Sequence, residues 1–109
     1  MILTPDGPVL IDWTGAGRGP RISPFGLLLS SAATDLRLVD AIVAGYRPHL
    51  RLAPEELARL AGAVRAFGLI LDCWTAVHYP HLLRTVVEGQ AGRRETAEAI
   101  AARARVALS

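Results

Sequence analysis

Hydrophobic residues form two short runs at the N-terminus and recur at helical spacing after them. Residues 1–3 and 9–11 are apolar, and Pro5-Asp6-Gly7 between them is a turn signal. After residue 13 the chain is too rich in glycine to continue a strand. The pattern predicts a β-hairpin over residues 1–13, a glycine-rich loop over residues 14–23 and a helical segment over residues 24–109.

The helical segment is expected to begin with two short helices. Ser23-Pro24 is a start signal because proline is favoured at the first helical position, and an apolar helix over Phe25–Ala33 would follow. Thr34 is the expected cap of the next helix, with Asp35 in its first turn. Pro48 is expected to close that helix.

The longest helix is predicted to open at Pro54-Glu55-Glu56, where two acids face the positive end of the helix dipole. From Phe67 to Trp74 nearly every position is apolar, including Cys73, so this stretch is predicted to be buried on all sides. Pro80 should kink or end the helix. After a break at residues 89–92, a last helix is predicted from about Arg94 to Ala107. Its expected core positions share helical spacing: Ala97, Ile100, Ala101, Ala104 and Leu108.

These elements predict an α+β fold, mostly α, with a short N-terminal hairpin and about four helices in a single partial domain over residues 1–109. The sequence is 51% hydrophobic, which suits a piece whose apolar faces expect neighbours. A formal net charge of +2 does not favour a nucleic acid or a membrane surface as partner. The single cysteine excludes an internal disulfide and fits a reducing compartment. No signal peptide is recognisable and no apolar run is expected to approach the ~18 residues of a membrane span, so a cytoplasmic location is expected.

Asp12 is the main candidate for chemistry because it ends the second apolar run and precedes a loose glycine segment. A carboxylate in such a place is held rigidly while its oxygens stay open to a ligand. It is also in the position of an ordinary residue that caps the following turn. Gly15, Gly17 and Gly19 lack the helix start and the acid of a dinucleotide site, so they are interpreted as a loop that needs permissive backbone angles. Trp13 is expected to anchor that loop by packing.

The segment Val9-Leu10-Ile11-Asp12-Trp13, followed by Ala16-Gly17-Arg18-Gly19-Pro20, resembles the metal-binding segment of the aminoglycoside phosphotransferase and choline kinase-like enzymes. These enzymes are relatives of the protein kinases. The resemblance is specific over residues 7–20 and looser over the helices. It implies that Asp12 binds Mg²⁺ against the phosphates of ATP, and that the chain is the rear part of a kinase-like C-terminal lobe.

The resemblance also shows what these 109 residues lack. In the family, a His-Gly-Asp catalytic loop with a later asparagine and a nucleotide-binding lobe with a lysine precede this segment; the chain contains neither that motif nor any lysine. The family's frequent acid after the Gly-x-Pro turn is missing too, since Pro24-Phe25-Gly26 stands there. No catalytic or nucleotide-binding residue is therefore assigned.

Two functions follow as expectations. The first is a C-terminal fragment of an ATP- and Mg²⁺-dependent phosphotransferase acting on a small-molecule hydroxyl such as an aminoglycoside or an amino alcohol, inactive alone. Its partners would be that substrate, the missing N-terminal portion or a second copy, with no nucleic acid and no membrane. The alternative is a small helical interaction module that keeps part of the kinase scaffold without catalysis.

Other polar residues have simpler explanations. Asp72 lies in an apolar stretch and is expected to pair with an arginine such as Arg65; the alternative is a contact to a cationic substrate, since acceptors of this family are often amines. His78 and His81 lie three apart, but Pro80 between them spoils the helical geometry, so structural or solvent-facing roles are expected. The basic C-terminal residues are expected to form a solvated helix face: Arg93, Arg94, Arg103 and Arg105.

Overall fold

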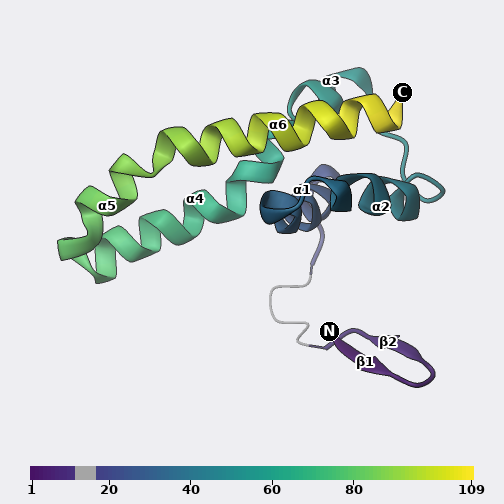
Figure 1. The fold of residues 1–109 in the computed structure, drawn as a ribbon, viewed down its shortest axis with the longest axis horizontal. Coiled ribbons are helices and arrows are strands. Elements are labelled where there is room, and N and C mark those ends of the chain that lie inside the picture. Colours follow the sequence, from purple (N-terminus) through teal and green to yellow (C-terminus); the bar gives the residue numbers. More distant parts are fainter. Residues whose placement is uncertain (12–16) are drawn as a thin grey trace.

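The computed structural model of the chain describes residues 1–11 and 17–109. The fold is α+β and mostly α, as predicted: a two-stranded hairpin stands apart from a group of helices (Figure 1). The strands are β1 (Ile2–Thr4) and β2 (Gly7–Val9). The helices are α1 (Ile22–Ser30), α2 (Arg37–Tyr46), α3 (Pro54–Ala58), α4 (Leu60–His78), α5 (Leu83–Glu88) and α6 (Gln90–Leu108), with 3₁₀ turns η1 (Ser31–Thr34) and η2 (Pro80–Leu82).

The hairpin is antiparallel and tight. Ile2 lies opposite Val9 and Thr4 lies opposite Gly7, whose φ of +116° favours glycine. The Thr4 hydroxyl donates a hydrogen bond to the Gly7 carbonyl at 2.6 Å and closes the turn. The second strand ends at Val9, so the prediction that the strand runs on through residues 10 and 11 was wrong. The register explains this, because only Met1 remains on the other strand to pair with the chain beyond Val9.

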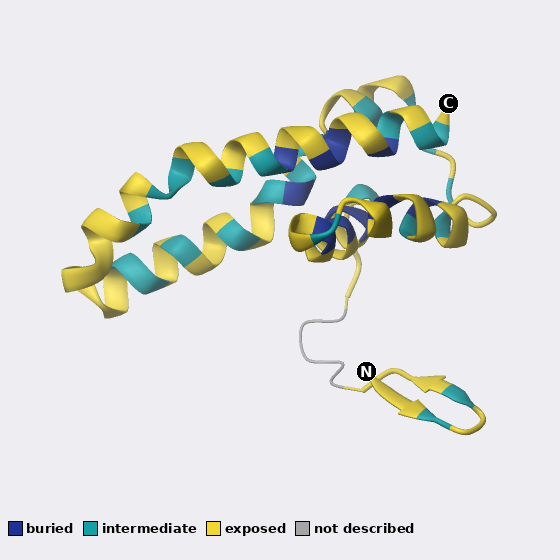
Figure 2. Cartoon of the chain, in the orientation of Figure 1, coloured by how far each residue is buried: buried dark blue, intermediate teal, exposed yellow. Residues whose placement is uncertain are grey.

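The core occupies one end of the helical group. It is formed by α1, η1, α2, the first turns of α4 and the C-terminal half of α6 (Figure 2). Its buried side chains are Phe25, Leu29, Ala32, Val39, Val43, Leu60, Val64, Ala97, Ile100, Ala101 and Ala104. The predicted core positions of the last helix are confirmed, with Leu108 half-buried against the same cluster.

α1 and α4 approach each other closely at Gly26. A Cβ atom added to Gly26 would lie only 2.5 Å from the carbonyl carbon of Ala63 and 2.6 Å from its oxygen. The two helix backbones therefore touch at Gly26, which leaves no space for any side chain there.

Several helix boundaries differ from the prediction. α1 begins at Ile22 and its continuation is the 3₁₀ turn η1. Thr34 does not cap α2; instead the Asp35 carboxylate accepts a hydrogen bond from the backbone N–H of Arg37 at 3.0 Å. The ends of α2 near Pro48 and of α4 before Pro80 agree with the prediction.

The longest predicted helix is divided into α3 and α4 at Arg59, whose φ and ψ are −92° and 3°. The guanidinium of Arg105 on α6 donates to the carbonyl oxygens of Leu57 and Ala58 at 2.9 and 3.3 Å. These carbonyls end α3 and need partners, so a side chain distant in sequence stabilises the break.

The prediction that Phe67–Trp74 is buried on all sides was wrong. Phe67 is 47% exposed and Trp74 is 51% exposed, and Cys73 is exposed as well. The reason lies in the arrangement of the helices: the core ends near Val64, and beyond it α4 projects as an arm with α5 and the start of α6 along one side (Figure 2).

Within the described residues, α4 is long and apolar enough to cross a membrane by length and composition alone. The expectation that no apolar stretch approaches this length was therefore wrong. The core helix of a soluble protein passes the same test, so the finding by itself is weak evidence for a membrane location.

Glu56 fixes the start of α3. Its carboxylate accepts hydrogen bonds from the Arg21 side chain at 2.7 and 2.8 Å and from the Ala53 N–H at 2.7 Å. The hydrogen bonds from the Arg21 side chain, and next the one from Ala53, lower the pKa of Glu56 from 4.5 to about 2.

This shift predicts an acid-sensitive contribution to stability. Because the folded-state pKa is depressed, the contribution is present above about pH 5 and is lost as the pH falls toward 2. Urea unfolding should show wild type more stable than Glu56→Gln at neutral pH, with the difference shrinking as the pH approaches 2. Glu55→Gln, at an exposed neighbour in the same turn, is the control because it leaves the hydrogen bonds of Glu56 in place. A pH-independent difference for Glu56→Gln would contradict the assignment.

Candidate functional site

The main candidate, Asp12, lies outside the described residues, as do Trp13 and Gly15. Its assignment as a magnesium ligand stays a prediction. On the far side of the gap, Gly17 and Gly19 have open space around their Cα atoms and no positive φ, so the expectation that these two need glycine for their backbone angles was wrong.

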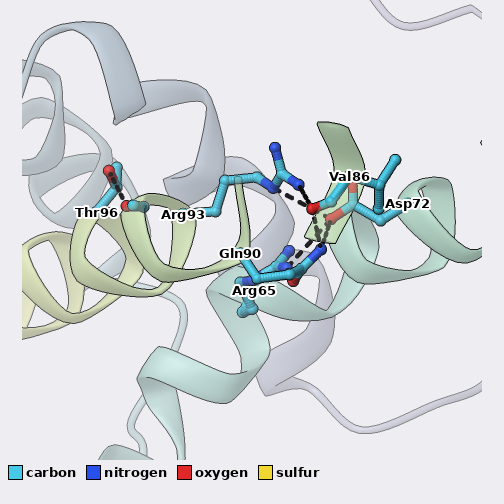
Figure 3. A network of polar contacts seen from close by, with 7 residues as sticks. Arg65, Asp72, Val86, Gln90, Arg93 and Thr96 are labelled. Atoms are coloured by element: carbon cyan, nitrogen blue, oxygen red, sulfur yellow. Dashed lines mark hydrogen bonds and ion pairs between the residues drawn. The ribbon is translucent and has the colours of Figure 1, made fainter. Parts of the chain in front are cut away.

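A polar cluster joins α4, α5 and α6 in the arm (Figure 3). Asp72 Oδ2 accepts hydrogen bonds from Arg65 Nη2 at 3.1 Å and from Gln90 Nε2 at 2.9 Å, and Arg93 Nε lies 3.2 Å from it. Arg65 also donates to Gln90 Oε1. The side chains of Asp72 and Arg65 are only 17% and 16% exposed, so this ion pair is largely shielded from water.

The charges of the cluster decide between the two interpretations of Asp72. Burial alone would raise the pKa of Asp72, but the hydrogen bonds from Gln90 and Arg65 and the charges of Arg93 and Arg65 outweigh burial and keep the pKa below its usual value. Two guanidinium groups against one carboxylate leave the cluster net positive. The predicted pairing with Arg65 is confirmed, and a cationic substrate finds no uncompensated carboxylate here.

Arg93 has a second role in the cluster. Its Nη2 donates to the Val86 carbonyl at 2.8 Å, and Gln90 Nε2 donates to the same oxygen at 3.2 Å. This carbonyl belongs to the end of α5, where the helix cannot satisfy its own acceptors. Arg93 Nε is buried and lacks a hydrogen bond of good geometry, so its attraction to Asp72 is one of charge. The cluster therefore closes the turn between α5 and α6.

The two histidines at the tip of the arm contact aromatic side chains. His78 stacks on Trp74 with ring centroids 4.3 Å apart, and its Nδ1 lies 2.9 Å from the Trp74 carbonyl oxygen. His81 packs edge-on to Tyr79. No group of three or more histidine, cysteine or acidic residues is close enough to hold a metal among the residues the structure describes. The predicted structural or solvent-facing roles are confirmed.

The basic C-terminal residues are more engaged than predicted. Arg103 pairs with Asp40 at 2.6 Å and links α6 to α2, while Arg105 donates to the end of α3 and Arg93 belongs to the Asp72 cluster. The expectation of a purely solvated face was wrong for these three. A run of arginines in a helix does not reveal partners 48 or 63 residues away, as for Arg105 and Arg103.

A groove of about 390 Å³ opens between α4, α6 and the end of α1. Apolar and small side chains provide most of its wall, and Arg65 and Arg93 also line it. None of the residues that line it is an aspartate or a glutamate.

Comparisons of the chain with protein-family models, with curated proteins and with solved structures find no match.

Proposed function

We propose that the chain is the C-terminal part of an ATP- and Mg²⁺-dependent phosphotransferase that acts on a small-molecule hydroxyl such as an aminoglycoside or an amino alcohol. The proposal is supported by the sequence segment Ile11-Asp12-Trp13 with Gly17-Arg18-Gly19-Pro20, which follows a tight hairpin in the chain. The strand pairing ends at Val9, three residues before Asp12 in the sequence.

In this proposal Asp12 is the metal ligand. Bound Mg²⁺ supplies charge neutralisation on the phosphates during transfer. One fixed carboxylate is enough for this ion, because Mg²⁺ retains waters and takes further oxygens from the nucleotide. Positioning of the acceptor and removal of its proton need groups that these 109 residues do not contain, so the chain alone is proposed to be inactive.

An ATP-consumption assay tests the proposal. The 109-residue chain should show no turnover with aminoglycosides or choline-like alcohols. A version extended upstream in frame to include a His-Gly-Asp loop and a nucleotide lobe should turn over ATP with at least one of them. In the extended version, Asp12→Asn should lower turnover about 100-fold or more, because a metal contributes several kcal/mol to charge stabilisation.

Asp6→Asn is the matched control, since it removes a carboxylate from the same hairpin six residues earlier. It should leave turnover near the wild-type level. Turnover by the 109-residue chain would refute the inactivity, and an extended chain that ignores every acceptor, or is unaffected by Asp12→Asn, would refute the enzyme.

The alternative, a helical interaction module, is favoured by the exposed apolar surface of α4. Genomic DNA distinguishes the two. An in-frame His-Gly-Asp with a later asparagine just upstream supports the enzyme, whereas a stop codon immediately before Met1 together with a well-folded isolated chain supports the module.

A further inference from the structure

The groove between α4, α6 and the end of α1 combines an apolar wall with two arginines. Val64, Ala97 and Ile100 line it and are buried, while Phe67 and Leu71 line it and are about half exposed. Its volume of about 390 Å³ lies at the small end of the range of ligand pockets, roughly 300–1,000 Å³. The groove therefore suits a short ligand with an apolar body.

The two hydroxyl groups of the groove already have partners. Ser30 Oγ donates a hydrogen bond to a carbonyl of α1 at 2.6 Å, and Thr96 Oγ1 donates to a carbonyl of α6 at 3.0 Å (Figure 3). The remaining polar side chains of the lining are those of Arg65 and Arg93. A polar group on a ligand would therefore meet guanidinium donors.

Arg65 has a donor to spare at the groove. Its Nη2 donates to Asp72 and Gln90, but no hydrogen bond joins its Nη1 to any residue that the structure describes. This Nη1 lies 3.3 Å from the place of a Cβ atom on Gly68, which itself lines the groove. A side chain at position 68 would cover the nitrogen, and glycine leaves it open. Because a guanidinium carries several N–H groups, Arg65 can bind a further acceptor without leaving Asp72.

The charges at this end of the groove are not balanced. Asp72 has a pKa below its usual value and is ionised at neutral pH, and it faces both Arg65 and Arg93. One carboxylate against two guanidinium groups leaves one positive charge in a setting largely shielded from water, where Coulomb attraction is stronger than in bulk solvent. A single negative charge on a ligand would restore the balance.

We propose that the groove binds a small organic monocarboxylate, with the carboxylate at Arg65 and an aliphatic body along the apolar wall. Guanidinium groups match the geometry of a carboxylate, and one negative charge equals the uncompensated charge of the cluster. A phosphate monoester carries about −1.5 to −2 at neutral pH and would leave the cluster negative. Aminoglycosides and amino alcohols are cations, so this site is separate from that of the acceptor in the proposed enzyme.

A titration of the 109-residue chain with octanoate, followed by two-dimensional NMR of the backbone amides, tests the site. The amides of Gly68, Thr96 and Ala97 should shift and saturate with a dissociation constant of about 0.1–1 mM, as suits a ligand of roughly ten non-hydrogen atoms. Hexanoate should bind about tenfold more weakly, because each buried CH₂ group contributes about fourfold in affinity.

Three variants separate the groove from general positive charge. Gly68→Leu places a side chain in front of Arg65 Nη1 and should weaken octanoate binding about tenfold or more. It should fold, because leucine is a better helix former than glycine. Arg93→Gln removes the uncompensated charge and should weaken binding about tenfold. Arg94→Gln is the matched control: it removes the same charge from the next position of α6, which is exposed and outside the groove lining, and should leave binding within about twofold.

Two further ligands test the charge of the head group. Octylamine, a cation with the same chain, should leave the groove amides unshifted, and octyl phosphate should bind no more tightly than octanoate. The proposal would be overturned by octanoate shifts that do not saturate or that centre on Trp74 and Val77 instead. Unchanged binding in Gly68→Leu, or equal binding by octylamine, would overturn it as well. None of these measurements involves ATP turnover, so this site and the proposed enzyme can fail independently.

Discussion

Gly26→Ala is expected to destabilise the protein by about 3 kcal/mol, the upper end of the usual cost of overpacking a core. The new methyl group would lie 2.5 Å from the Ala63 carbonyl carbon and 2.7 Å from its Cβ, and the nearest atoms are backbone. A flexible side chain could turn away, but here α1 and α4 must separate. Urea unfolding should show the loss, and the melting temperature should fall by about 10–20 °C.

Gly62→Ala is the matched control because it lies one residue before Ala63 in the same helix. A Cβ added to Gly62 meets nothing within 4 Å. Alanine is the better helix former, so this substitution should stabilise by about 0.5–1 kcal/mol. Opposite signs at two glycines on facing helices would isolate the steric contact from helix propensity. Equal effects would mean that the space beside Gly26 accepts a methyl group, so that α1 and α4 are not in close contact there.

The elements with a regular pattern could be predicted from the sequence. The spacing of Ala97, Ile100, Ala101 and Ala104 identified the buried face of α6, and the turn residues before Gly7 identified the hairpin. These features depend on residues within one or two turns of each other. Local sequence carries that information directly.

Burial of α4 could not be predicted in the same way. An apolar run shows which residues favour burial but does not show which element covers them, and the described residues leave Phe67 and Trp74 about half exposed. The same limit applies to Gly26, whose role depends on the approach of a helix 37 residues later. Tertiary packing decides both.

The Asp72 cluster was predicted in part. Arg65 lies seven residues before Asp72, two turns along the same face of the helix, so their pairing follows from the helical period. Gln90 and Arg93 come from α6, which returns beside α4 only because of the turns at Pro80 and Gly89. The sequence did hold one signal for their role: Gln90 and Arg93 follow the break at Gly89, and helix ends need side-chain partners.

Asp72→Ala is expected to lower the free energy of unfolding by about 2 kcal/mol. This value lies in the usual range for the loss of hydrogen bonds to a charged group. Removing the carboxylate leaves Arg65 and Arg93 close together without their common acceptor, and Arg65 is only 16% exposed. Amide hydrogen exchange should rise first in α5, because Arg93 and Gln90 hold its last turn. A double-mutant cycle with Arg65→Ala should give a coupling energy of about 1–2 kcal/mol.

Asp40→Ala is the control. It removes an exposed acid from its pair with Arg103 and should have a much smaller effect on the free energy of unfolding. If the two aspartate substitutions cost the same, the arm is not held by its ion cluster.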